Sequence, residues 1–119
     1  MPSKNDSIQH LTTQICEFRD ARDWAQFHSP KDLAVAIAAE AGELLQHFVW
    51  QSPTQSETRV LERKDAIGAE MADIAILLFE MAQISGISLG DAIAEKLHRN
   101  EARYPVAKAR GSNLKYNEL

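Results

Sequence analysis

The sequence contains little of what several classes of protein require. Its 119 residues include one cysteine, four prolines and five glycines, and aromatic residues make up 7% of the chain. The single cysteine, Cys16, excludes an internal disulfide and any zinc or iron centre built from several sulfur ligands. No run of about 18 apolar residues occurs, and the N-terminus has no apolar stretch of signal-peptide length. These absences predict a cytoplasmic protein in a reducing compartment, with no membrane partner, in which Cys16 is an ordinary thiol beside the core.

Charge of both signs is present, and it is unevenly placed. Thirteen Lys and Arg residues stand against seventeen Asp and Glu residues, which gives a formal net charge of −4. Residues 40–80 hold eight acids and three bases, whereas residues 96–116 hold six bases and one acid. A basic tract this short in an acidic protein argues against a nucleic-acid polymer as partner and favours a small anionic ligand.

Length and apolar periodicity together predict one all-α domain. A chain of this length buries about two thirds of the surface that its unfolded form exposes, enough for one core, so residues 1–119 are expected to form a single domain. Apolar residues recur with helical period in four blocks, and strand-like alternation is nearly absent. The first two helices are predicted over residues 7–22, with Ser7 as N-cap, and over residues 30–50. Residues 51–56 are predicted to form a loop.

The second half of the chain has the same periodicity. It predicts a helix over residues 57–85, interrupted around Gly68 because a glycine costs a helix about 1 kcal/mol. A fourth helix is predicted over residues 88–103, with Ser88 and Asp91 as a capping box. The residues beyond it, 106–119, are expected to form an irregular basic tail.

Four carboxylates stand where the pattern predicts a core. Glu40 and Glu43 are the only charges in one apolar segment, and Glu70 and Asp73 are the only charges between residues 70 and 79. A spacing of three places both members of each pair on one helix face. Ionised carboxylates in apolar surroundings cost several kcal/mol each, so they become protonated, pair with bases or are bridged by cations. With four together, cations are favoured, and all-oxygen ligation favours Mg²⁺ or Mn²⁺. The alternative is that each pair lies on a solvated helix edge.

Two further groups of side chains fit a nucleotide. Lys96, Asn100 and Arg103, spaced by four and three, share a helix face and suit phosphate oxygens, although charged stripes on terminal helices are commonly solvated surface. The aromatic side chains Trp24, His28 and Trp50 lie near the two ends of the second predicted helix. They suit the stacking of a nucleobase, and the alternative is that both tryptophans pack in the core.

Several motifs in these segments point to one family. They are EAGEL at 40–44, EMADI at 70–74 and K-x3-N-x2-RYP at 96–105. Together they resemble the MazG-like nucleoside triphosphate pyrophosphohydrolases of the all-α NTP pyrophosphatase superfamily. The segments RDWxQFH at 22–28 and KYNEL at 115–119 more specifically resemble the dCTP pyrophosphatase branch. The resemblance covers nearly the whole chain.

The resemblance implies a fold, an activity and a set of site residues. The implied fold is a bundle of four to five helices assembled as a homodimer or homotetramer. The implied activity is Mg²⁺-dependent cleavage of a (deoxy)nucleoside triphosphate, such as dCTP, between the α and β phosphates, which removes it from the nucleotide pool. The implied metal ligands and catalytic residues are Glu40, Glu43, Glu70 and Asp73. The positions implied near the phosphates or sugar are Lys96, Asn100, Arg103 and Tyr104. The implied base pocket contains Trp24, His28 and Trp50.

The sequence leaves three points open. Leu77 stands where the dCTP branch often has a tyrosine that contacts the deoxyribose, so the base and sugar preferences are not fixed. A di-iron carboxylate bundle would need two Glu-x-x-His pairs, and Glu95 with His98 is the only one in the sequence. A helical binding or regulatory module without catalysis is the remaining alternative, and the intact acids at all four motif positions argue against it.

Overall fold

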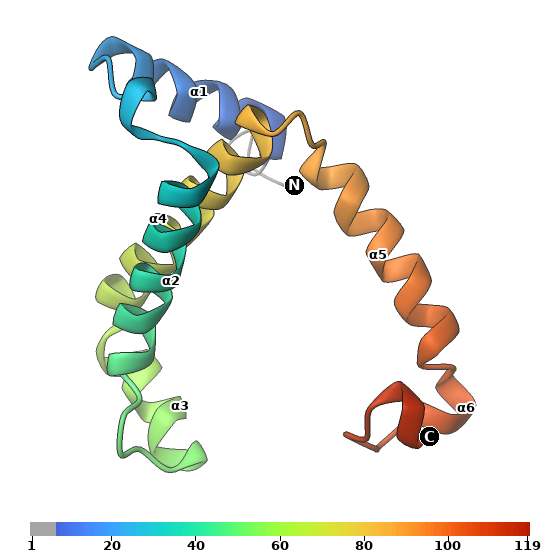
Figure 1. The fold of residues 1–119 in the computed structure, drawn as a ribbon. Helices are drawn as coiled ribbons and strands as arrows, with labels where there is room; N and C mark the ends of the chain where they lie inside the picture. The colour runs from blue at the N-terminus through green and yellow to red at the C-terminus, as the bar shows by residue number, and fades with distance from the viewer. Residues whose placement is uncertain (1–6) are drawn as a thin grey trace. The chain divides into compact units, whose positions relative to one another are not determined.

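The computed structural model describes residues 7–119, so the first six residues of the predicted single domain lie outside the described part. Residues 7–119 contain helices and no strand, which confirms the all-α prediction. No single helix among them is both long enough and apolar enough to cross a membrane. The α-helices are α1 (Ile8–Ala21), α2 (Pro30–Gln46), α3 (Pro53–Glu62), α4 (Lys64–Ile84), α5 (Leu89–Arg103) and α6 (Val106–Ala109), and the 3-10 turns are η2 (Ala25–Phe27) and η3 (Tyr116–Glu118) (Figure 1).

The first two helices begin where the sequence predicts, because each has a serine as N-cap. The Ser7 hydroxyl accepts a hydrogen bond from the His10 backbone N–H at 3.3 Å. At the start of α2 the Ser29 hydroxyl accepts one from the Asp32 backbone N–H at 3.1 Å, and Pro30 occupies the first turn. Each serine satisfies one of the N–H groups that a helix start leaves without an intrahelical partner.

The prediction that the second helix reaches residue 50 is wrong, because α2 ends at Gln46. Beyond it the backbone N–H groups of His47 and Phe48 donate to the carbonyls three residues earlier, at 3.3 and 2.9 Å. Such bonds tighten a helix end into a turn. Trp50 then adopts a φ of +64°, a left-handed conformation that ends the helical path.

The predicted loop over residues 51–56 is also wrong beyond Ser52, because α3 begins at Pro53. The Ser52 hydroxyl accepts from the Gln55 backbone N–H at 3.1 Å, and the Gln55 side chain accepts from the Ser52 backbone N–H at 2.9 Å. This reciprocal pair is a capping box, and proline is favoured in the first turn that follows one.

The predicted interruption of the third helix exists, but at Arg63 and not at Gly68. Arg63 has φ −121° and ψ 31°, and it is the residue that separates α3 from α4. Gly68 lies inside α4, beside Ile67, which is only 5% exposed. The burial of Ile67 offsets the helix cost of about 1 kcal/mol that the glycine brings.

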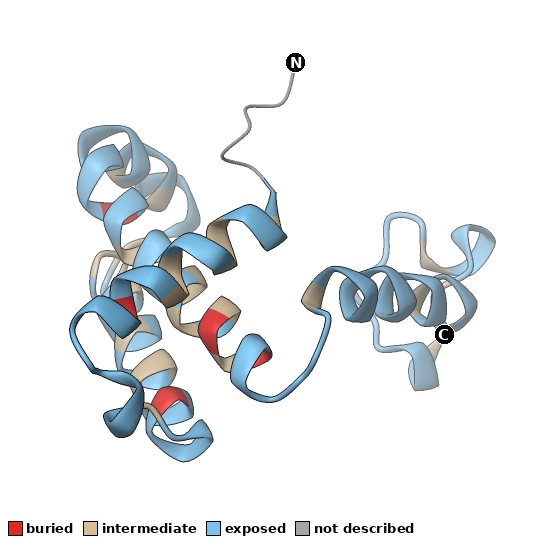
Figure 2. Cartoon of the chain, turned by 90° about the horizontal axis from the view of Figure 1, so that it is seen from above, coloured by how far each residue is buried: buried red, intermediate tan, exposed pale blue. Residues whose placement is uncertain are grey.

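Of the described residues, 7–86 form one compact unit in which α1 and α2 pack against α4. Helices α2 and α4 lie side by side (Figure 1). Glu43, near the end of α2, is close to Glu70 in the first third of α4, and His28, just before α2, contacts Glu80 near the end of α4. The two helices are therefore antiparallel. Every buried residue of the described part of the chain lies in this unit, and these residues are Arg19, Leu33, Ile67, Glu80 and Ala82 (Figure 2).

Residues 87–119 form a second compact unit, which contains α5, α6 and η3. The predicted capping box at the start of α5 is wrong, because the Ser88 side chain makes no capping hydrogen bond. At the other end of α5 the Tyr116 ring packs edge-on against Tyr104, with ring centres 6.1 Å apart, and the Arg103 guanidinium lies 4.7 Å from its centre. These contacts tie the C-terminal residues to the end of α5.

Candidate functional site

Three carboxylates from α2 and α4 converge between the two helices. Glu40 and Glu43 on α2 and Glu70 on α4 each offer an oxygen, and these oxygens all lie within 4.8 Å of one another. The spacing of three along α2 places its two glutamates on the face that meets α4. Three of the four acids singled out in the sequence are thus brought to one place.

The surroundings of this carboxylate cluster disfavour the ionised form of its side chains. The Oε2 atoms of Glu40 and Glu70 are buried, and neither has a hydrogen-bond partner within residues 7–119. Burial raises the pKa of both carboxyls above the usual value, and the neighbouring Glu43 raises it further. Buried polar atoms in native proteins nearly always have a partner. The cluster therefore has the properties of a site that a bound cation completes.

Asp73, the fourth acid, is exposed on α4, one turn beyond Glu70. It lies outside the group of three converging residues. Its negative charge nevertheless contributes to the raised pKa of both Glu40 and Glu70, so it stands close to the cluster. The donor set is made of carboxylate oxygens, which suit a hard divalent cation and not zinc or copper.

The aromatic candidates are largely exposed. Trp24 is 43% exposed, packs edge-on against Phe18 with ring centres 5.8 Å apart, and lies 6.4 Å from the His28 ring. Trp50 is 95% exposed. Neither tryptophan is a core residue, so the alternative that both pack in the core is wrong.

These aromatic residues do not form one pocket within a single chain. Trp24 and His28 precede the first residue of α2, whereas Trp50 follows its last turn. With 17 residues and a rise of about 1.5 Å per residue, α2 is about 25 Å long. Trp50 lies at the end of α2 that carries Glu43, and Trp24 and His28 lie at the opposite end.

The phosphate-binding candidates belong to the second unit. Lys96 is exposed on α5, and Asn100 one turn later is half-buried. Arg103 and Tyr104, at the end of the helix, both contact Tyr116. The predicted helix face is therefore formed, with its last members held by the C-terminal residues.

The sequence reasoning missed a buried charged group near His28. Glu80 on α4 is only 2% exposed, and its Oε1 lies 2.5 Å from His28 Nδ1 and 3.6 Å from Arg19 Nη1. Arg19 is itself buried on α1. An acid inside the most apolar stretch of the chain was the available signal, but it falls outside the two paired motifs.

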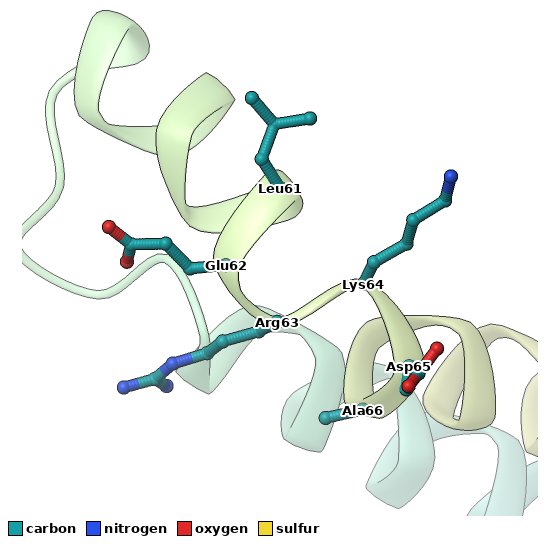
Figure 3. A pocket seen from close by; sticks show the side chains of 6 residues that line it. All are labelled: Leu61, Glu62, Arg63, Lys64, Asp65 and Ala66. Carbon is teal, nitrogen blue, oxygen red and sulfur yellow. The ribbon is translucent and has the colours of Figure 1, made fainter.

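A surface pocket at the junction of α3 and α4 carries no comparable arrangement. It is lined by the six residues 61–66, whose side chains do not point toward a common centre: Leu61 and Lys64 extend to one side, and Glu62 and Arg63 to another (Figure 3). Side chains that diverge in this way do not place polar groups around a common ligand.

Residues 7–119 are thus all-helical, with three acids that form a carboxylate cluster between two packed helices, an arrangement able to hold a cation. The MazG-like family matches residues 35–119, and the chain belongs to this family.

Named relatives agree with this assignment. The chain is 34% identical to dCTP pyrophosphatase 1 of Mus musculus and 32% identical to that of Homo sapiens, in each case over 98% of this chain and 70% of the relative. A solved structure of a pyrophosphatase from Archaeoglobus fulgidus is 33% identical, with a TM-score of 0.80 over 88% of this chain and 98% of that one. The predicted family and the predicted enzyme class, a pyrophosphohydrolase, are confirmed.

Proposed function

We propose that the protein hydrolyses a deoxynucleoside triphosphate such as dCTP to the monophosphate and pyrophosphate, with Mg²⁺ held by Glu40, Glu43, Glu70 and Asp73. The observation that carries this proposal is the convergence of three carboxylates, two of which have a buried oxygen without a hydrogen-bond partner in the described chain. Mn²⁺ is the expected substitute, since it accepts the same oxygen ligands. The names of the relatives support dCTP as substrate.

The carboxylates have two tasks in this proposal. Mg²⁺ held there would supply the positive charge that draws electron density from the triphosphate and stabilises the pyrophosphate leaving group. Glu40 and Glu70, fixed on two packed helices, hold the cation in place. A carboxylate of the cluster accepts the proton of the water that attacks the α-phosphorus, as a general base. Glu43, which is exposed at the edge of the cluster, is well placed to reach such a water.

The remaining candidate residues bind the rest of the nucleotide. Trp24, His28 and Trp50 bind the base, mainly by stacking, which contributes about 1–3 kcal/mol for each stacked base. The residues that contact the phosphates and sugar are Lys96, Asn100, Arg103 and Tyr104. Lysine serves as a point charge for the phosphates, and arginine offers a planar fork of donors.

The separation along α2 supports a homo-oligomer, a dimer or a tetramer, with a shared site. Trp24 and His28 are about 25 Å from Trp50 along α2, which is too far for one base to touch all three in a single chain. A second copy resolves this, because its Trp24 and His28 complete the pocket beside the first chain's Trp50 and carboxylates. The exposure of Trp50, at 95%, fits a surface that another molecule covers.

A nucleotide panel tests the activity. The full chain is incubated with each dNTP and NTP in Mg²⁺ or in EDTA, and pyrophosphate is measured. We expect pyrophosphate from dCTP with Mg²⁺ and none with EDTA. Glu57→Gln, which removes an exposed acid of α3 outside the cluster, is the control and keeps wild-type activity. Absence of pyrophosphate from every nucleotide would overturn the proposed activity in favour of a binding module.

Mixing two weakened variants, assayed at a dCTP concentration well below the KM of His28→Ala, tests the shared site. Glu43→Gln removes a cluster carboxylate and His28→Ala removes a base-pocket side chain, so each homo-oligomer has weakened sites. If sites are shared, mixed oligomers contain some sites built only from intact residues, and activity at this low dCTP concentration rises above that of either variant alone. Activity that stays at the average of the two would show that each chain builds its own site.

A further inference from the structure

Glu80 is a buried acid that the proposed reaction does not use. It lies ten residues beyond Glu70 on α4, about 15 Å along the helix, and its side chain is 3% exposed. A carboxylate in such a place has to be paired, because burial of a single charge is strongly unfavourable. Two neighbours meet this need, one from the connector after α1 and one from α1 itself.

The first neighbour is His28, whose Nδ1 lies 2.5 Å from Glu80 Oε1. A carboxylate next to a buried guanidinium, here Arg19 at 3.6 Å, accepts hydrogen bonds, so the contact is assigned with His28 donating from Nδ1. The ring is thereby fixed with Nδ1 toward α4 and Nε2 on the side away from it. The His28 side chain remains 25% exposed, so a ligand can reach the imidazole.

The second neighbour is Arg19, which compensates the charge of Glu80. Its Nη1 lies 3.6 Å from Glu80 Oε1 and donates to Gln83 Oε1 at 3.2 Å, while its Nε donates to Asp20 at 2.8 Å. The hydrogen bond to Asp20 raises the pKa of Arg19, so the guanidinium stays charged. With Arg19 as counter-ion, Glu80 holds the histidine mainly through the hydrogen bond.

We propose that Glu80 is a positioning residue that fixes the His28 imidazole for recognition of the nucleotide base. This inference rests on the proposed function, in which His28 binds the base. A neutral imidazole with its proton on Nδ1 presents Nε2 as an acceptor. An acceptor at that position suits an exocyclic amino group, as in cytosine, and not the carbonyl oxygen that uracil has in its place.

Kinetics of paired variants test the proposal. Arg19→Met with Glu80→Met removes both buried charges together, which avoids leaving one of them without a partner. We expect the KM for dCTP to rise about tenfold with kcat within about twofold, and the preference for dCTP over dUTP to fall. His28→Ala gives the same change, and adding it to the double variant gives no further loss, as expected of residues that act through one another.

Gln83→Leu is the matched control, because it removes a partner of Arg19 without touching His28 or Glu80. It keeps the wild-type KM and the wild-type preference for dCTP. A wild-type KM in the Arg19→Met, Glu80→Met variant would overturn the proposal, and so would losses that add when His28→Ala is combined with it.

Nitrogen NMR of the full chain labelled in its histidines separates this inference from the proposed activity. We expect His28 to show the tautomer with the proton on Nδ1 in the wild type and a mixture of tautomers in the Arg19→Met, Glu80→Met variant. The same tautomer distribution in both proteins would overturn the positioning role. This measurement needs no turnover, so it decides the role of Glu80 even if no nucleotide is hydrolysed.

Discussion

Two glutamates on α4 meet opposite surroundings. Glu70 faces Glu40 and Glu43, and its buried Oε2 has no hydrogen-bond partner in residues 7–119. Glu80, ten residues later on the same helix, is more deeply buried and is paired with His28 and Arg19. Burial alone therefore does not distinguish a carboxylate that could bind a cation from one that the protein itself neutralises. The distinction lies in whether the protein itself supplies the partner.

The carboxylate cluster around Glu70 has the features of a site that a bound ligand would stabilise. The acids there repel one another, and burial raises the pKa of Glu40 and Glu70. The end with Glu80 is complete in the protein alone, since a guanidinium and an imidazole surround the acid. Substitutions at the two ends should therefore have opposite effects on stability.

The largest expected effect is on turnover at the cluster end. We expect Glu43→Gln or Asp73→Asn to lower kcat with dCTP and Mg²⁺ at least about a hundredfold, a typical loss for an essential electrostatic or acid-base group. Steady-state pyrophosphate release measures it, with Glu57→Gln as the control. Wild-type turnover in both cluster variants would show that the carboxylates at this end of α4 do not form the metal site.

The next effect is on stability, with opposite signs at the two ends. Glu80→Ala leaves the buried Arg19 paired with the exposed Asp20 but without its buried acidic partner, and it should lower the free energy of unfolding by about 3 kcal/mol. Glu70→Gln, measured in EDTA, should raise it, because it relieves repulsion within the cluster. Urea denaturation of both variants in the same buffer gives the comparison. Equal destabilisation by the two substitutions would mean that the cluster is not strained without a cation.

A smaller effect is the pH dependence of the protein in EDTA. A carboxyl whose pKa is higher in the folded than in the unfolded chain stabilises the fold below its ordinary value of 4.5, and this contribution is lost as the pH rises through the folded-state pKa. Relative to Glu70→Gln, the wild type should therefore lose stability as the pH rises from about 4.5. Thermal melting of the two proteins across this range measures the difference.

Mg²⁺ supplies the control for this pH effect. A cation bound to the ionised carboxylates should oppose the loss, so that the difference between wild type and Glu70→Gln reverses at neutral pH when Mg²⁺ is present. A difference that stays constant with pH in EDTA would show that Glu70 titrates in the folded chain as it does in the unfolded one.

The sequence was most informative where charged residues stand inside an otherwise apolar helical segment. Glu40 with Glu43, and Glu70 with Asp73, stand in apolar helical segments, and the spacing of three predicts a common helix face for each pair. Glu80 was missed because its partners, Arg19 and His28, are more than 50 residues away in sequence. A single acid in an apolar run does not reveal which distant segment neutralises it.

Helix boundaries show the same limit. Gly68 was expected to interrupt a helix, yet the packing of α4 outweighs the local glycine cost, and the interruption falls at Arg63, which has no distinctive local signal. By contrast, the start of α3 at Pro53 was readable from Ser52 and Gln55, a local capping box that the loop prediction overlooked. Local rules predict helix starts well, whereas helix interruptions depend on tertiary packing.

The smallest expected change in the folded protein comes from Trp50, at the end of α2 beside the cluster. Its side chain is 95% exposed and its backbone is left-handed, so Trp50→Ala removes no buried contact of the chain and should leave the melting temperature in the absence of nucleotide nearly unchanged. If Trp50 stacks on the base, the KM for dCTP should rise about tenfold, within the range of about 1–3 kcal/mol for one stacked base. Melting curves with and without dCTP, in Ca²⁺ or another cation that does not support turnover, separate the two effects. If the variant melts like the wild type both with and without dCTP, Trp50 does not contact the base, and base recognition belongs to Trp24 and His28 alone.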